Sequence, residues 1–358
     1  MTRERPSPAD GRDSGLPSSP GGASAASPRR PGESEREFAD RQKLESRLGR
    51  IRRRIVVLSG KGGVGKSTVA VNLAAALARA GEKTGLLDVD IHGPSIPTML
   101  GLEGAIPAAD GKEFVPVEAE GIRVMSLGFL LASPDDAVIW RGPLKMGVIR
   151  QFLSDVAWGE LDFLVVDSPP GTGDEPLSLC QLLGRVDGAV IVTTPQKVAA
   201  VDVRKCVTFC RKLAVPVLGV VENMSGFACP KCGEIAPIFS AGGGRALAEG
   251  MGVPFLGAIP IDPLIAESGD RGLPFIRHYA GTPTARIMEE IIRPILALDP
   301  KESAAVTVGA AARPERIEGS PPRQRNQRRM PTMRIAIPIT GGALSAHFGH
   351  CETFALID

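Results

Sequence analysis

Gly60-Lys61-Gly62-Gly63-Val64-Gly65-Lys66-Ser67 is the stretch that decides the fold of this chain. It matches G-x-x-x-x-G-K-[ST], a loop whose backbone N–H groups surround the phosphates of a nucleotide. The loop lies between an apolar run at 55–58, which predicts a strand, and an alanine-rich run at 69–80, which predicts a helix. Glycines allow the tight turn, and the start of the helix adds a positive dipole. The sequence therefore predicts a site for ATP with Mg²⁺, formed by residues 60–67 and Thr68.

The residues around this loop alternate between short apolar runs and helical patterns. Apolar runs recur at 55–59, 85–90, 122–127, 163–167, 189–194, 217–222 and 255–259, and helical patterns at 66–80, 144–156, 198–213, 243–250 and 284–297. Runs rich in β-branched residues without polar alternation are typical of strands buried on both faces. We expect an α/β fold, a mainly parallel sheet with helices on both faces, over residues 53–298.

The ends of the chain have a different composition. Residues 1–36 contain few large apolar side chains and are predicted to be disordered, and 37–52 to form a lead-in helix. Residues 299–332 have a linker composition. The last stretch, 333–358, begins an apolar strand and contains His347, His350 and Cys351. It resembles the opening of a dinitrogenase iron–molybdenum cofactor-type domain, too short to form a core of its own, and we assign it no activity.

Composition narrows the class of protein. The net charge is +2, and the basic runs lie in the predicted tails, so no nucleic-acid partner is expected. There is no run of 18 apolar residues and no secretory signal, so no membrane partner is expected and the predicted location is cytoplasmic. The six cysteines do not form a disulfide-like pattern.

Three aspartates follow predicted strands and belong to the predicted site. Asp167 ends the run 163–166, where an acid commonly holds Mg²⁺. Asp88 and Asp90 end the run 85–90, and a period of two places both side chains on one side of the strand. We expect Ser67 and Asp167 to bind Mg²⁺.

Cys229 and Cys232 form the one close cysteine pair, in Cys229-Pro230-Lys231-Cys232-Gly233. Two thiolates supply half of the ligands of a tetrahedral metal or a four-iron cluster, and a two-fold dimer would supply all four. The spacing alone fits zinc as well as iron–sulfur, and a redox dithiol is a further alternative. Cys206 and Cys210 are four residues apart in a predicted helix with apolar neighbours, which favours packing in the core.

The loop with its second lysine, Lys61, resembles that of the deviant Walker A family, which includes nitrogenase iron protein, MinD/ParA-type ATPases, arsenite-pump ATPases and the Mrp/ApbC iron–sulfur carriers. The resemblance covers about residues 53–294. It implies that Lys61 reaches the nucleotide of a partner in a homodimer and that Lys66 binds phosphate. The segment 88–95 resembles the first switch of Mrp-type ATPases. This implies that Asp90 orients the attacking water and that Asp88 belongs to the Mg²⁺ shell or supports it. It also implies that Asn223 and Pro260 lie near the adenine base.

The order of motifs is most similar to that of the Mrp/ApbC carriers, in which a CxxC pair after the Asn-Met-Ser segment bridges a [4Fe-4S] cluster between subunits. The resemblance implies a slow ATPase, with Lys61, Lys66 and Asp90 as catalytic residues, that carries this cluster to iron–sulfur apoproteins. A MinD/ParA-type positioning ATPase without a cluster is the main alternative. A binding scaffold without ATP turnover is another.

Overall fold

The computed structural model describes residues 28–90, 93–110, 113–131, 142–228, 234–236, 238, 242–298, 335–340, 343–344 and 353–357. The predictions for 1–27 and 299–332 lie outside these residues. The chain divides into two units, the first containing the described residues up to 298 and the second those from 335. Each is described by itself.

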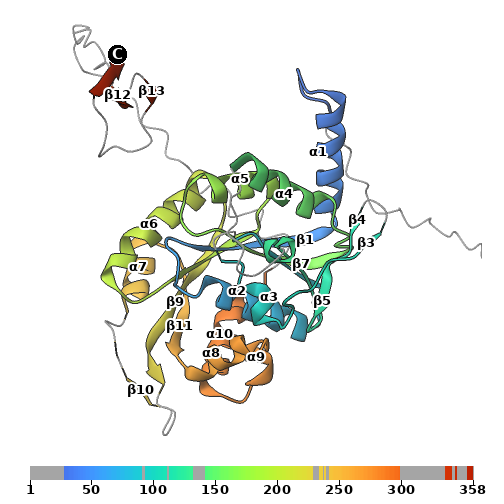
Figure 1. Ribbon diagram of the computed structural model, residues 1–358. Coiled ribbons are helices and arrows are strands. Elements are labelled where there is room, and N and C mark those ends of the chain that lie inside the picture. Colours follow the sequence, from blue (N-terminus) through green and yellow to red (C-terminus); the bar gives the residue numbers. More distant parts are fainter. Residues whose placement is uncertain are drawn as a thin grey trace, which may run out of the picture. The chain divides into compact units, whose positions relative to one another are not determined.

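The first unit is built on one large sheet (Figure 1). Its strand order is β10-β9-β8-β1-β7-β2-β6-β5, and β11 also pairs with β9. The central strands pair in parallel, whereas β5 and β10 run antiparallel to their neighbours. The strands are β1 (Ile51–Ser59), β2 (Thr84–Asp88), β5 (Val117–Ala119), β6 (Ile122–Ser126), β7 (Leu161–Asp167), β8 (Gly188–Thr193), β9 (Val217–Ala228), β10 (Ile235–Ala236) and β11 (Phe255–Ile261). A separate short hairpin pairs β3 (Ala109–Asp110) with β4 (Glu113–Phe114).

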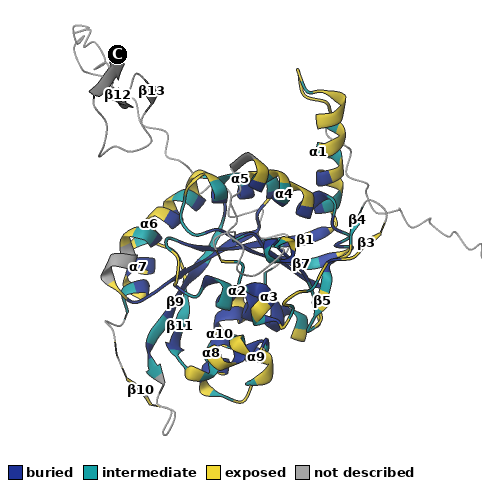
Figure 2. Ribbon diagram, in the orientation of Figure 1, coloured by how far each residue is buried: buried dark blue, intermediate teal, exposed yellow. Residues whose placement is uncertain are grey.

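Helices cover both faces of this sheet, and the strands between them are buried (Figures 1 and 2). On one face, α2 and α10 pack on residues such as Ile55 and Val57. On the other, α4 and α5 cover Val56 and Leu58, and α6 and α7 cover the part of the sheet near β8 and β9. The described α-helices are α1 (Glu35–Leu48), α2 (Lys66–Arg79), α3 (Ile96–Met99), α4 (Gly142–Ser154), α5 (Asp174–Leu183), α6 (Lys197–Lys212), α7 (Gly243–Met251), α8 (Pro263–Asp270), α9 (Phe275–His278) and α10 (Pro283–Leu296), and a 3-10 turn spans Leu127–Leu130. This arrangement confirms the predicted α/β fold.

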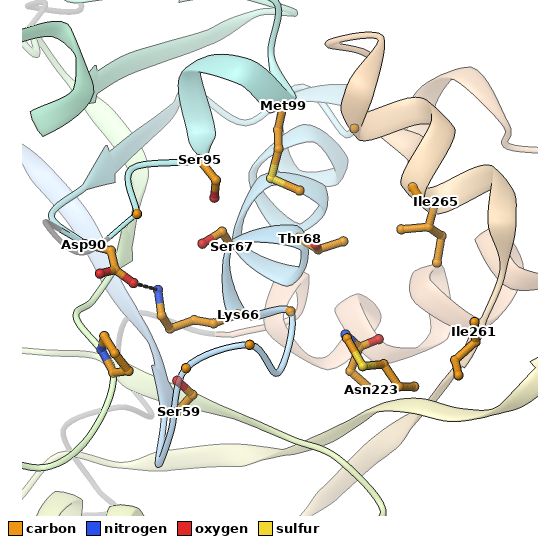
Figure 3. A pocket seen from close by; sticks show the side chains of 18 of the residues that line it. Ser59, Lys66, Ser67, Thr68, Asp90, Ser95, Met99, Asn223, Ile261 and Ile265 are labelled. Carbon is orange, nitrogen blue, oxygen red and sulfur yellow. Dashed lines mark ion pairs between the residues drawn. The ribbon is translucent and has the colours of Figure 1, made fainter. Parts of the chain in front are cut away.

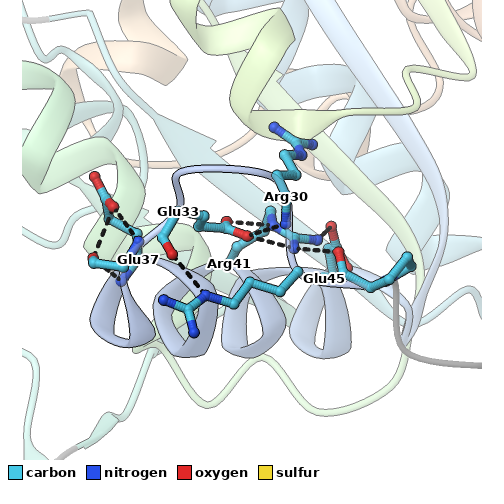
Figure 4. A network of polar contacts seen from close by, with 8 residues as sticks. Arg30, Glu33, Glu37, Arg41 and Glu45 are labelled. Carbon is cyan, nitrogen blue, oxygen red and sulfur yellow. Dashed lines mark hydrogen bonds and ion pairs between the residues drawn. The ribbon is translucent and has the colours of Figure 1, made fainter.

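The first helix differs from the predicted span 37–52. Helix α1 begins at Glu35 because Ser34 caps it: the Ser34 hydroxyl accepts a bond from the Glu37 N–H, and the Glu37 carboxylate accepts one from the Ser34 N–H. Figure 4 shows the adjoining network, in which Arg41 pairs with Glu33 and Glu45. The helix ends at Leu48, and the last predicted helical residues belong instead to β1.

Other elements also begin or end at different residues from those predicted. The predicted strand 85–90 was too long: strand β2 ends at Asp88, and Asp90 lies after it. Strand β9 continues well past residue 222, and α3, α5, α8 and α9 were not predicted. Three of these missed helices contain a proline in the first turn (Pro97, Pro176 and Pro263), where its absent N–H costs nothing, and such prolines are easily read as turns.

The second unit contains an antiparallel sheet of β12 (Ile335–Thr340), β13 (Ala343–Leu344) and β14 (Thr353–Ile357). His347, His350 and Cys351 lie outside the described residues. That 333–358 begins a cofactor-type domain stays a prediction.

Within the described part of the chain, no helix combines the length and apolar character needed to cross a membrane.

Candidate nucleotide-binding site

A cavity of about 780 Å³ opens at the carboxyl edge of the sheet, above the N-terminus of α2 (Figure 3). The loop between β1 and α2 forms one wall, and residues after β2, within β9 and at the end of β11 form others. Ligands in open α/β sheets bind at this edge, because the loops there leave a crevice. Of the predicted residues, the lining includes Lys61, Gly62, Gly63, Gly65, Lys66, Ser67, Thr68, Asp90, Asn223 and Pro260.

Two glycines of the loop occupy positions that other residues cannot take. Gly65 precedes α2 with φ of 80°, in the left-handed region, and a Cβ on it would collide with the side-chain nitrogen of Asn223. A Cβ on Gly60 would collide with Asp202 of α6. The loop therefore needs glycine at 65 for its turn and at 60 for close packing against a neighbouring helix.

Lys66 and Ser67 line the cavity and contact Asp167, which is fully buried and does not line it. The Lys66 Nζ lies 2.6 Å from Asp167 Oδ1 and 3.2 Å from Asp90 Oδ2. The Ser67 hydroxyl donates to Asp167 Oδ2 at 2.6 Å. Burial alone would lower the pKa of Lys66, but Asp167 and then Asp90 outweigh burial and raise it, so this lysine is a fixed cation.

Asp88 and Asp167 are neighbours in register on β2 and β7, and both are fully buried. The Asp88 carboxylate accepts bonds from the Ser126 hydroxyl at 2.8 Å and the Asp90 N–H at 3.1 Å. Burial, followed by the charge of Asp167, raises the pKa of Asp88 to about 8. Burial likewise raises the pKa of Asp167, against the opposing effect of Lys66. Two buried carboxylates beside a phosphate loop, poorly compensated by one lysine, suit a divalent cation.

Asn223 lies at the opposite end of the cavity from Asp90 (Figure 3), and Pro260, which directly precedes Ile261 in β11, also lines the cavity. The Asn223 amide donates to the Val64 carbonyl at 2.9 Å, so its nitrogen is bonded to the phosphate loop itself. Ile261 and Ile265 line the same end, which gives it an apolar wall suited to a flat base (Figure 3).

Lys61 lines the cavity and is half-buried, and within the described residues it makes no ion pair. Its backbone carbonyl accepts a bond from the Ser59 hydroxyl at 3.0 Å. Among the described residues Lys66 is the cation that pairs with Asp167. The reach of Lys61 to a partner's nucleotide stays a prediction.

Cys229 and Cys232 lie outside the described residues. Cys180, Cys206 and Cys210 are free and buried, and burial raises the pKa of Cys206 and of Cys210 to about 12. A thiol held protonated by burial is a poor metal ligand. Their place in the core agrees with the packing role expected for Cys206 and Cys210.

Sequence reasoning missed the residues that support the site from other elements. Ser126 ends β6 and bonds Asp88, and Ile265 belongs to the unpredicted helix α8. No motif marks either one, because a single serine or isoleucine is common at any position. Sequence reasoning also missed Glu222, which the structure buries. An acid that ends an apolar run directly before Asn223 is a usable signal, because such a residue is rarely buried unless it is paired.

The fold and this loop define the class: the chain is a P-loop nucleotide-binding protein. A model of the ParA family, described as NUBPL iron-transfer P-loop NTPase, matches residues 50–296, and the chain belongs to this family.

Relatives of known name and solved structures are similar to about two thirds of this chain or more. An iron-sulfur cluster carrier protein of Methanocaldococcus jannaschii is 52% identical over 235 residues, covering 65% of this chain and 81% of its own length. The human cytosolic Fe-S cluster assembly factor NUBP2 is 51% identical over 258 residues, covering 71% of this chain and 95% of its own. A nucleotide-binding protein of Archaeoglobus fulgidus in complex with ADP is 43% identical with a TM-score of 0.60, covering 69% of this chain and 95% of that one. The cell division ATPase MinD of Pyrococcus furiosus, 24% identical with a TM-score of 0.50, covers 68% and 98%, and shares the fold.

Proposed function

We propose that this protein is a cytoplasmic ATPase that carries a [4Fe-4S] cluster and delivers it to iron–sulfur apoproteins. The observation that carries the proposal is the pair Cys229 and Cys232 in a chain that also has the phosphate-loop site, within the matched region 50–296. The names of the archaeal and human relatives support the same cargo.

The nucleotide part of the mechanism rests on positioning and charge. We assign the phosphates to the backbone of 60–68 and to Lys66, and Mg²⁺ to Ser67, Asp88 and Asp167. Asp90, 3.2 Å from the Lys66 ammonium in the described chain, would orient the attacking water once phosphate draws the lysine away. Asn223 and Pro260 would face the base.

The cluster part of the mechanism requires two copies of the chain. One pair of thiolates fills half of a four-iron cluster, so we propose a homodimer in which each subunit contributes Cys229 and Cys232. In the same dimer Lys61 of each subunit would approach the phosphates of its partner, which would explain a lysine that lines the cavity without an ion pair among the described residues. Cluster and nucleotide would then both depend on assembly.

Anaerobic reconstitution with iron and sulfide tests the cargo. We expect about four irons per dimer and a broad visible absorption, both lost in a Cys229→Ser/Cys232→Ser variant. The matched control is Cys206→Ala/Cys210→Ala, which removes two thiols from the core and should keep the iron. Iron binding that survives loss of the first pair would disprove the assignment.

The mass of the reconstituted protein tests the assembly. Sedimentation should give a dimer with nucleotide and iron present, and Lys61→Gln should slow ATP hydrolysis while keeping ADP bound. A strictly monomeric protein under these conditions would refute the carrier mechanism. Hydrolysis stimulated by lipid or DNA, with no iron bound, would instead indicate a positioning ATPase.

A further inference from the structure

The end of β9 touches the nucleotide cavity on one face and α7 on the other. Successive residues of a strand point to opposite faces of the sheet. Val221 belongs to the core under α2, and Val220 to the core under α6 and α7. The next two residues continue this alternation: Asn223 donates to the Val64 carbonyl of the phosphate loop, whereas Glu222 bonds the first turn of α7.

Glu222 accepts three hydrogen bonds, two from the N-terminus of α7 and one from Ser225 of its own strand. Its carboxylate accepts from the Gly244 N–H at 2.5 Å, the Gly242 N–H at 3.3 Å and the Ser225 hydroxyl at 2.5 Å. The side chain is 1% exposed, and no lysine or arginine in the described chain pairs with it. A buried carboxylate is stable here because the first N–H groups of a helix carry partial positive charge and bond no other helical carbonyl.

The same part of β9 contains a bulge that faces the cavity. The pairing of β11 with β9 shifts register between Ile259, opposite Asn223, and Ile261, opposite Phe227. Within the bulge Met224 has φ of 59°, a left-handed conformation that costs energy for a residue with a Cβ. Met224 also lines the nucleotide cavity.

Glu222 connects the nucleotide cavity to the part of the chain that contains the two cysteines. Strand β9 ends at Ala228 and α7 begins at Gly243, and Cys229 and Cys232 stand between them in sequence. Glu222 belongs to β9, which precedes the cysteines, and it bonds the start of α7, which follows them. Ser225 lies within the bulge and donates to Glu222, so this bond connects the bulge to the Glu222 carboxylate.

We propose that the segment 222–226 couples nucleotide binding to the two cysteines, with Glu222 as the positioning residue. Nucleotide contacts at Asn223 and Met224 favour one conformation of the bulge. Ser225 passes this change to the Glu222 carboxylate, and so to the start of α7. The proposal rests on the proposed function, in which the two cysteines bind the cluster. The coupling of bound nucleotide to the two thiols can be measured without iron.

Alkylation of the metal-free protein measures this link directly. The rates of iodoacetamide reaction at Cys229 and Cys232 are followed by peptide mass spectrometry, with and without Mg²⁺-ADP. In the wild type we expect the nucleotide to change both rates by about fivefold or more. In Glu222→Gln, which keeps the shape but loses the charge, the change should fall below about twofold, while ADP affinity measured by calorimetry stays within about threefold of the wild-type value.

Two further variants separate coupling from stability. Ser225→Ala removes one hydrogen-bond donor and leaves Glu222 in place. It should reduce the effect of ADP on the alkylation rates. If Glu222→Gln does not fold, the Ser225→Ala variant tests the coupling by itself. Thr282→Ala removes the cap of α10, where the hydroxyl accepts from the Ala285 N–H, and should keep the full nucleotide effect despite a similar loss of stability.

The proposal is overturned if ADP leaves both thiol rates of the wild type unchanged, or if Glu222→Gln and Ser225→Ala keep the full effect. Equal loss of the effect in Thr282→Ala would also overturn it, since the role would then be structural. A wild-type protein with nucleotide-dependent thiols that binds no iron would refute the carrier function and leave the coupling intact.

Discussion

Replacing Asp88 with asparagine should stabilise the nucleotide-free and Mg²⁺-free protein at neutral pH. Asp88 and Asp167 lie opposite each other on β2 and β7, both fully buried, and Lys66 bonds Asp167 rather than Asp88. Asparagine has nearly the shape of aspartate and cannot ionise. The variant therefore removes one of two buried negative charges without opening a cavity.

The sign and size follow from the pKa of Asp88, which burial and then Asp167 raise from 3.8 to about 8. Since the folded state binds the proton more tightly than the unfolded state, this group's stabilisation is complete below its unfolded pKa and is lost as the pH rises toward 8. Each pH unit in that window costs at most about 1.4 kcal/mol, so the step from pH 5 to pH 7 costs at most about 3 kcal/mol. A change of that size corresponds to roughly 6–12 °C in Tm for a domain of this length.

Asparagine itself carries a penalty that does not depend on pH. The Asp88 carboxylate accepts from Ser126 and from the Asp90 N–H, and the amide loses one acceptor, which costs about 1 kcal/mol. We therefore expect Asp88→Asn to be no more stable than the wild type at pH 5 and clearly more stable at pH 7 to 8.

Thermal unfolding in EDTA across this pH range is the assay. The matched control is Asp162→Asn: burial would raise the pKa of Asp162, but Arg52, 2.8 Å away, outweighs it and lowers the pKa, so this variant should gain nothing as the pH rises. A stability difference between Asp88→Asn and wild type that stays flat from pH 5 to pH 8 would refute the reasoning. Saturating Mg²⁺-ADP should reverse the order, because the cation needs the charge that the variant lacks.

Three other expectations concern single side chains. Asp167→Asn should weaken Mg²⁺-dependent ADP binding by about a hundredfold and Mg²⁺-free binding far less, by calorimetry, because it removes one buried charge at the cation site. Gly65→Ala should cost at least about 1–3 kcal/mol of stability by denaturant unfolding, because its φ of 80° is left-handed and its Cβ would collide with a neighbour; Gly62→Ala, with open space around its Cβ, should cost less. Cys206 should resist alkylation at pH 8 in the folded protein, because burial raises its pKa to about 12; rapid labelling would show that the thiol is exposed.

The sequence predicted the sheet because local pattern and global fold agree in its centre. The runs at 55–59 and 163–167 are apolar without alternation, and both are central strands buried on both faces. The phosphate loop was predictable for the same reason, because glycine, lysine and serine at this fixed spacing are typical of one loop geometry. Those features depend on neighbours in the chain.

The supporting contacts were not predictable because they join residues far apart in sequence. Nothing local marks Ser126 as the partner of Asp88, and Glu222 bonds backbone N–H groups that any sequence at 242–244 would provide. The predicted strand 85–90 was also too long. Asp90 fits the period of two of a strand, but β2 ends at Asp88 and Asp90 forms an ion pair with Lys66 instead.

The sequence alone therefore determined the class of fold, the phosphate loop and the acids at the strand ends, because each is fixed by residue type at short spacing. Only the tertiary structure decided which acids share Lys66, how strongly burial holds a proton on Asp88, and that Asn223 and Glu222 face two different sites from one strand. Charge interactions and burial depend on distances through space, and these exist only once the sheet has assembled.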